Sequence, residues 1–201
     1  TARIYPQVAG SVAAPYRAWD EPASASASGL VIKIAQWSFD NWGEDVIANR
    51  SGSNIFYFDS DASVTPERAT LVTTSPVSVN SIVISPNDRH LIALGANEYS
   101  PTATVSGTFN PMLVRWADQD DRTNWVPSVS STAGEVVLTD GTQIIGGLRA
   151  RNAINIWTDN SLWLMNFAGP PFTFRFEQKG TNCGLVGPHA GVDHNGVTYW
   201  M

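Results

Sequence analysis

Short runs of β-branched and aromatic residues follow one another along this chain, and residues that favour turns separate them. Residues 154–158 and 161–165 are two such runs on either side of Asp159-Asn160, a pair that tolerates the positive φ of a tight turn. In the segment 172–177, strict alternation places three phenylalanines on one face. The sequence therefore predicts a β-hairpin followed by a third strand.

Similar runs predict strands over most of the remaining chain, whereas helical periodicity is nearly absent. The predicted strands cover 30–37, 54–59, 78–85, 90–95, 112–117, 135–139, 142–149 and 196–201, besides the three already named. The expected fold class is all-β.

Turn signals recur along these strands at 51–52, 86–88, 122–123, 159–160 and 195–196. Their spacing of about 36 residues lies within the range of repeated supersecondary units. Repeated antiparallel units of this length predict β-propeller-like blades, and a β-sandwich is the alternative. The last strand ends without a closing turn, so we expect a partial propeller or one that another chain completes.

Composition divides the chain into two parts. Residues 1–29 contain three prolines and a tract of alternating Ala and Ser, which predicts an extended arm and a flexible loop. Residues 30–201 form the expected β-domain. The lone Cys183 excludes an internal disulfide and is expected to be a small buried hydrophobic residue. No run approaches the roughly 18 apolar residues of a membrane helix, so membrane insertion is not expected.

Net charge restricts the expected partners. The formal net charge of −6 argues against tight nonspecific binding to nucleic acid, because phosphate neutralisation needs clustered Lys and Arg. Arg149 and Arg151 are the nearest approach to a basic cluster. A surface along which nucleic acid slides is compatible with this charge.

Candidate catalytic groups are few. No Gly-x-Ser-x-Gly motif accompanies His90, His189 and His194. His90 follows the 86–88 turn and His194 lies in the segment 193–196, so both are expected to be solvated turn residues. From these residues we expect that the chain is not an enzyme and that it has no catalytic residue, cofactor or metal site.

Two acidic segments offer functional alternatives. Asp40, Glu44 and Asp45 lie beside Trp37 and Trp42, as at a sugar subsite or in a glycosidase. Nothing in the sequence places a second acid opposite them, which favours a turn at Asp40-Asn41 and core packing for the tryptophans.

The second segment, 118–121, lacks the glycine and the distant glutamate of a calcium loop. It therefore predicts a solvated acidic loop, and Asp59-Ser60-Asp61 is interpreted in the same way.

Several aromatic-rich segments, taken in order, carry a resemblance to a known group of proteins. These segments are 36–45, 114–120, 124–127, 156–165, 182–188 and 199–201. From about Leu30 to the end, the chain resembles tailed-phage structural proteins. The group it is most similar to is the tail nozzle or tail hub of short-tailed phages, which includes tail tubular protein B and the packaged-DNA stabilisation proteins.

The resemblance implies a propeller-rich virion subunit made in the bacterial host cytoplasm. It would assemble as a ring-shaped homo-oligomer below the portal and adaptor, around the DNA exit channel. Passing DNA would make only nonspecific contacts with it. The alternative function is a carbohydrate- or receptor-binding tail module, which would use Trp37, Trp42 and Trp125 beside polar loops.

Overall fold

The computed structural model describes residues 36–61, 68–102, 107–169 and 172–201, all of which belong to one compact unit, Ala35–Met201. The predicted arm 1–29 and most of the predicted strand 30–37 lie outside the described residues. The all-β prediction is confirmed, because the described residues form 14 strands and no helix. Accordingly, none of these residues belongs to a helix that could cross a membrane.

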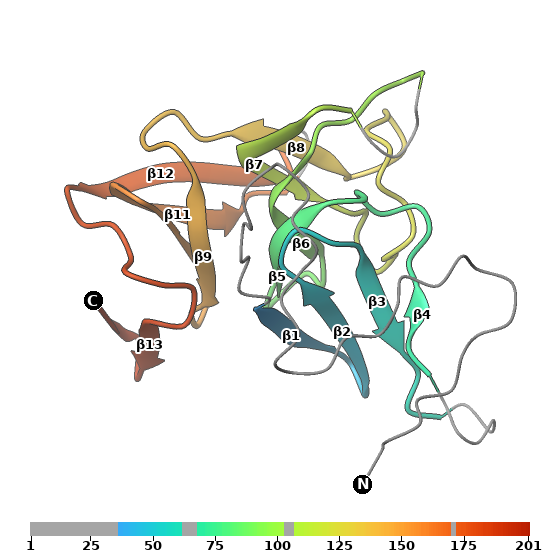
Figure 1. Ribbon diagram of the computed structural model, residues 1–201, viewed down its shortest axis with the longest axis horizontal. Helices are drawn as coiled ribbons and strands as arrows, with labels where there is room; N and C mark the ends of the chain where they lie inside the picture. Colours follow the sequence, from blue (N-terminus) through green and yellow to red (C-terminus); the bar gives the residue numbers. More distant parts are fainter. Residues whose placement is uncertain (1–35, 62–67, 103–106, 170–171) are drawn as a thin grey trace, which may run out of the picture. The chain divides into compact units, whose positions relative to one another are not determined.

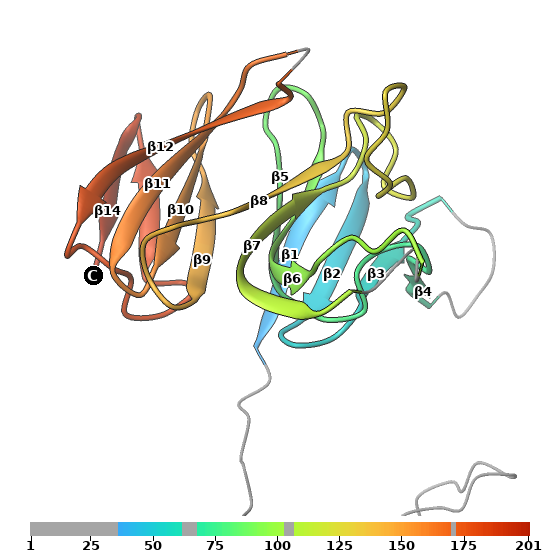
Figure 2. The ribbon, with the colours of Figure 1, turned by 90° about the horizontal axis from the view of Figure 1, so that it is seen from above.

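The strands form four antiparallel sheets that follow one another in chain order (Figures 1 and 2). We number the sheets 1 to 4. The strands of sheet 1 are β1 (Trp37–Trp42), β2 (Asp45–Arg50), β3 (Ile55–Phe58) and β4 (Thr70–Leu71). The strands of sheet 2 are β5 (Val79–Ile84), β6 (Leu91–Asn97), β7 (Phe109–Trp116) and β8 (Gly134–Val137).

Sheet 3 has the same up-and-down order as its predecessors. Its strands are β9 (Ile144–Arg149), β10 (Ile154–Thr158), β11 (Ser161–Phe167) and β12 (Phe174–Thr181). Sheet 4 is a hairpin of β13 (Gly191–His194) and β14 (Val197–Trp200). Four-stranded meanders in series are the units from which propeller blades are built, and the propeller itself stays a prediction.

Two apolar cores lie between these sheets. One core joins sheets 1 and 2 through Ile47, Ile55 and Ile82, and the other joins sheets 2 and 3 through Val83 and Ile156. Ile82 and Val83 are neighbours on β5, so alternate residues of one strand enter different cores. Sheet 2 is thus buried on both faces, whereas a two-sheet sandwich buries only one face of each sheet.

The first strands of the sheets lie next to one another in chain order. β1 contacts β5, β5 contacts β9, and β9 contacts β13. Figure 2 shows the same succession, from sheet 1 through sheets 2 and 3 to the final hairpin. This arrangement brings segments far apart in sequence to one place.

The regular turn spacing does not mark equivalent positions in the repeats. The turn at 51–52 joins β2 to β3, whereas the turn at 86–88 joins β5 to β6 and the turn at 122–123 lies between β7 and β8. The first strands begin at Trp37, Val79, Ile144 and Gly191, which are 42, 65 and 47 residues apart. Loops of different length therefore separate the sheets. The spacing of about 36 residues between turn signals does not correspond to the repeat of the sheets.

Candidate functional site

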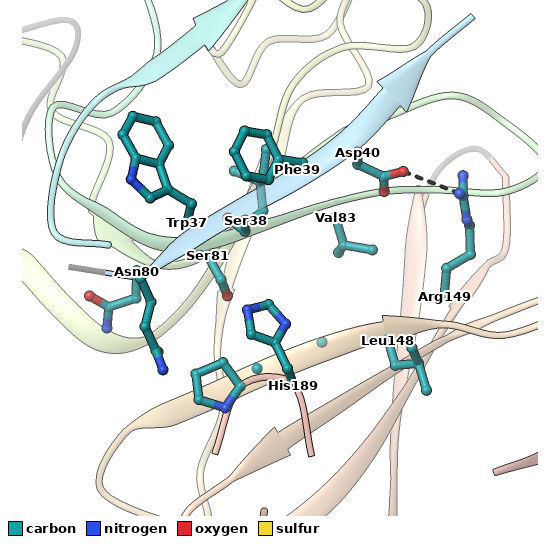
Figure 3. A pocket seen from close by; sticks show the side chains of 15 residues that line it. Trp37, Ser38, Phe39, Asp40, Asn80, Ser81, Val83, Leu148, Arg149 and His189 are labelled. Atoms are coloured by element: carbon teal, nitrogen blue, oxygen red, sulfur yellow. Dashed lines mark hydrogen bonds and ion pairs between the residues drawn. The ribbon is translucent and has the colours of Figure 1, made fainter. Parts of the chain in front are cut away.

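The first strands of sheets 1, 2 and 3 converge on a cavity of about 210 Å³ (Figure 3). The segment Pro188-His189, which precedes β13, closes a further side. The lining therefore comes from four places in the sequence. The cavity lies where successive sheets meet, and it is the candidate functional site.

Side chains of β1 satisfy the free edge of β5 beside this cavity. The Ser38 hydroxyl accepts a hydrogen bond from the Ile82 N–H at 3.1 Å, and the Asp40 carboxylate accepts one from the Ile84 N–H at 2.7 Å. The two donors, on β5, are two residues apart, and so are the two acceptors, on β1. The spacings match because alternate residues of a strand point to the same side. Without these acceptors, two backbone N–H groups would lack protein partners at the edge.

Asp40 also contacts sheet 3. Its second oxygen lies 3.1 Å from Nη2 of Arg149, at the end of β9 (Figure 3). One carboxylate therefore joins the first strands of three sheets. The turn predicted at Asp40-Asn41 is wrong, because both residues lie within β1 and the chain turns at Gly43-Glu44.

Two variants of Asp40 separate its two contacts. We expect Asp40→Asn to cost less than about 1 kcal/mol of unfolding free energy, because the amide oxygen still accepts from Ile84 and the Arg149 partner is 44 % exposed. Asp40→Ala leaves the Ile84 N–H without its acceptor and should cost about 1–3 kcal/mol. Urea unfolding measures the loss of unfolding free energy in both variants. Equal losses would show that the hydrogen bond from the Ile84 N–H to the side-chain oxygen at position 40 does not stabilise the fold.

An aromatic pair of β1, Trp37 and Phe39, alternates along the strand with Ser38 and Asp40 and also lines the cavity. The rings of Trp37 and Phe39 stack with centroids 5.8 Å apart, and the side chains are 46 % and 63 % exposed. The prediction of core packing is therefore wrong for Trp37. It is confirmed for Trp42, which is buried in the first core.

The other two predicted acids do not join Asp40 in the cavity. Glu44 lies in the β1–β2 turn, and Asp45 accepts a hydrogen bond from the Tyr57 hydroxyl at 2.5 Å. This bond lowers the pKa of Asp45 and raises that of Tyr57 to about 12. The arrangement does not present Asp40, Glu44 and Asp45 as facing carboxylates.

The Tyr57 shift predicts a pH dependence. In the folded chain Tyr57 holds its proton up to about pH 12, against an ordinary pKa of 10.0, so the unfolded state loses this proton first as the pH rises. The stabilisation is present below pH 10.0 and should be lost as the pH rises toward 12. Ultraviolet difference titration checks this. The tyrosine that titrates at the highest pH should be missing from the curve of Tyr57→Phe. In Asp45→Asn its titration should shift to lower pH, and an unchanged curve in Asp45→Asn would contradict the assignment to Tyr57.

The histidines differ in their burial. His194 is exposed at the end of β13, as predicted for a surface residue. His90 is fully buried, so the prediction of a solvated turn histidine is wrong. Its Nδ1 contacts the Asp88 carboxylate, its Nε2 lies 3.0 Å from the Thr132 hydroxyl, and Phe174 packs edge-on against its ring.

The acidic loop 118–121 is more ordered than predicted. Asp118 is half-buried and accepts hydrogen bonds from the Thr132 hydroxyl and from two backbone N–H groups, those of Gln119 and Thr132. Burial raises the pKa of Asp118, but these bonds and one from Asn124 outweigh burial and leave the pKa below its ordinary value. Asp118 thus holds the β7–β8 connection. Within the described parts of the chain, no group of three His, Cys, Asp or Glu side chains could hold a metal ion.

Two further predictions can be compared with the structure. Cys183 is half-buried and not buried, since it follows β12 in an irregular segment. Trp125 is fully buried and donates its indole N–H to the Arg122 carbonyl at 2.8 Å. It is therefore unavailable as a ligand-binding platform.

No protein-family model matches this chain, and no curated protein matches its sequence. The functional argument therefore depends on the geometry of the sheets and of the cavity.

Proposed function

We propose that this protein is a structural virion protein, a tail nozzle or hub subunit that forms part of a ring around the DNA exit channel. The observation that carries the proposal is the interlocked series of sheets. Ser38 and Asp40 tie β1 to β5, Asp40 with Arg149 ties β1 to β9, and apolar cores fill the space between sheets. Such a series resists deformation, because close-packed cores and satisfied edges leave little freedom to move.

Charge supports the same proposal. The net charge of −6 keeps phosphates from adhering to the chain as a whole. A conduit needs this property, since DNA has to pass without being retained.

The genomic neighbourhood and the virion test the proposal together. We expect portal or adaptor genes beside the gene for this chain, and we expect antibodies to the chain to label the tails of the assembled particles in electron micrographs. Label on capsids alone, or particles without the chain, would contradict it.

The exposed aromatic pair favours a second candidate, the carbohydrate- or receptor-binding tail module. Exposed aromatic rings stack on sugar faces, and Trp37 lines the cavity together with Asn80 and His189. Of the three tryptophans predicted for this role, only Trp37 is exposed, because Trp42 and Trp125 are buried. Glycan-array binding that Trp37→Ala abolishes and Trp200→Ala preserves would favour this candidate, and absence of binding by the native chain would remove it.

A further inference from the structure

Each sheet in this chain has one face toward the sheet before it and one toward the sheet after it. Sheet 1 uses the face with Trp42, Ile47 and Ile55 to pack on sheet 2. We call the opposite face of sheet 1 the leading face. Strand register assigns to it Trp37, Phe39 and Asn41 of β1, Val46, Ala48 and Arg50 of β2, Phe56 and Phe58 of β3, and Leu71 of β4.

The leading face is mainly apolar, with the polar side chains of Asn41 and Arg50 at opposite ends of the β1–β2 pair. Trp37, Phe39 and Leu71 are 46 %, 63 % and 45 % exposed, although they belong to the residue types that a single-sided sheet normally turns toward its core. Exposed apolar patches of this kind mark interaction surfaces.

Sheet 4 has the complementary arrangement. Its inner face meets sheet 3, where the Trp200 ring lies 5.9 Å from that of Trp157 and the Thr198 hydroxyl accepts a hydrogen bond from Asn155 at 2.9 Å. We call its outer face the trailing face. Register assigns to it Val192, His194, Val197 and Tyr199, whose three apolar members are 52 % to 59 % exposed.

We propose that the trailing face of one copy of this chain packs against the leading face of a second copy. The argument for a second copy is that the chain carries both halves of a contact it already makes between its own sheets. Inside the chain, the first strand of each sheet lies beside the first strand of the next. Continuing that rule across two copies places β13 of one copy beside β1 of the other, where Trp37 and Phe39 are exposed.

This contact joins two different surfaces, so it is heterologous and builds rings or filaments and not a closed two-fold dimer. The inference goes beyond the proposed tail function, because it names the two surfaces in contact. It does not depend on the assembly to which the protein belongs.

Mixed disulfide crosslinking of the full chain tests it. In a Cys183→Ser background, we expect Phe39→Cys and Tyr199→Cys proteins to form disulfide-linked heterodimers when mixed, and neither to form them alone. Val129→Cys, at another exposed apolar position, is the control and should not crosslink with Phe39→Cys. Phe39→Asp should reduce the mass seen in light scattering to that of a monomer.

Three results would overturn the inference. The first is crosslinking of Phe39→Cys with itself, which indicates a two-fold contact. The second is a monomer in which the thiol at position 39 does not react with a small reagent, which means that the chain covers its own leading face. The third is an oligomer without the 39–199 link, which would leave the tail assignment standing.

Discussion

Replacing His90 by Leu should destabilise the chain by about 3–5 kcal/mol, although its position after the 86–88 turn predicts a solvated side chain. His90 is 0 % exposed and Asp88 is 5 % exposed, so the substitution leaves a buried carboxylate without its imidazole partner. It also removes the contact that Thr132 makes with Nε2 at 3.0 Å. Urea or thermal unfolding followed by circular dichroism measures the loss.

Two controls make this result specific. His189→Leu changes an exposed histidine and should alter the unfolding free energy by no more than about 0.5 kcal/mol. Adding Asp88→Asn to His90→Leu should recover part of the loss, because the amide carries no charge. A loss below about 1 kcal/mol for His90→Leu would show that the buried pair does not stabilise the fold.

Replacing Trp157 by Ala should cost a similar amount, about 3–5 kcal/mol, because it removes a fully buried ring between sheets 3 and 4. The ring also lies 3.6 Å from where a Cβ on Gly191 would be, so the first strand of sheet 4 passes directly over it. We therefore expect sheet 4 to loosen and any association through its trailing face to weaken in the same variant.

Trp157→Phe is the matched control. The indole Nε1 is buried and has no acceptor among the described residues, so a phenyl ring removes an unsatisfied donor while it keeps most of the packing. It should cost clearly less than Trp157→Ala. Proteolysis near residues 191–201 that rises in Trp157→Ala and not in Trp157→Phe would support the link to sheet 4, and equal protection in both variants would contradict it.

Sequence patterns predicted correctly those strands whose conformation is determined by residues close together in the chain. The hairpin 154–165 is the clearest case, because β-branched and aromatic residues flank a turn pair, and β10 and β11 form there. The alternating phenylalanines likewise mark β12, which begins at Phe174 and not at Phe172.

Strands whose residues do not favour β-structure were missed. β1 contains Asp40-Asn41, a pair typical of turns, yet Asp40 is held in a strand by the Ile84 N–H, 44 residues away. β2, β4 and β13 were also not predicted, since each contains Asp, Asn, Thr or Gly, which strands disfavour or which the pattern does not mark. Their strand conformation depends on antiparallel partners that periodicity does not show.

The candidate site was predicted only in part. Asp40 and Trp37 were singled out as members of one acidic and aromatic segment, and both line the cavity. Arg149 and His189 were not connected with them, because sheet packing alone brings those residues to the same place. His90 was misassigned for the same reason: Phe174 and Asp88 bury it, whereas its turn context predicts exposure.

The central claim is that this chain serves a mechanical role by assembling with itself. Electron microscopy of the purified full chain, with light scattering across a range of concentrations, tests it most directly. We expect rings with an open axis whose mass is a whole multiple of the 21.7 kDa chain. A stable monomer at every concentration, with no ring in any field, would contradict the account.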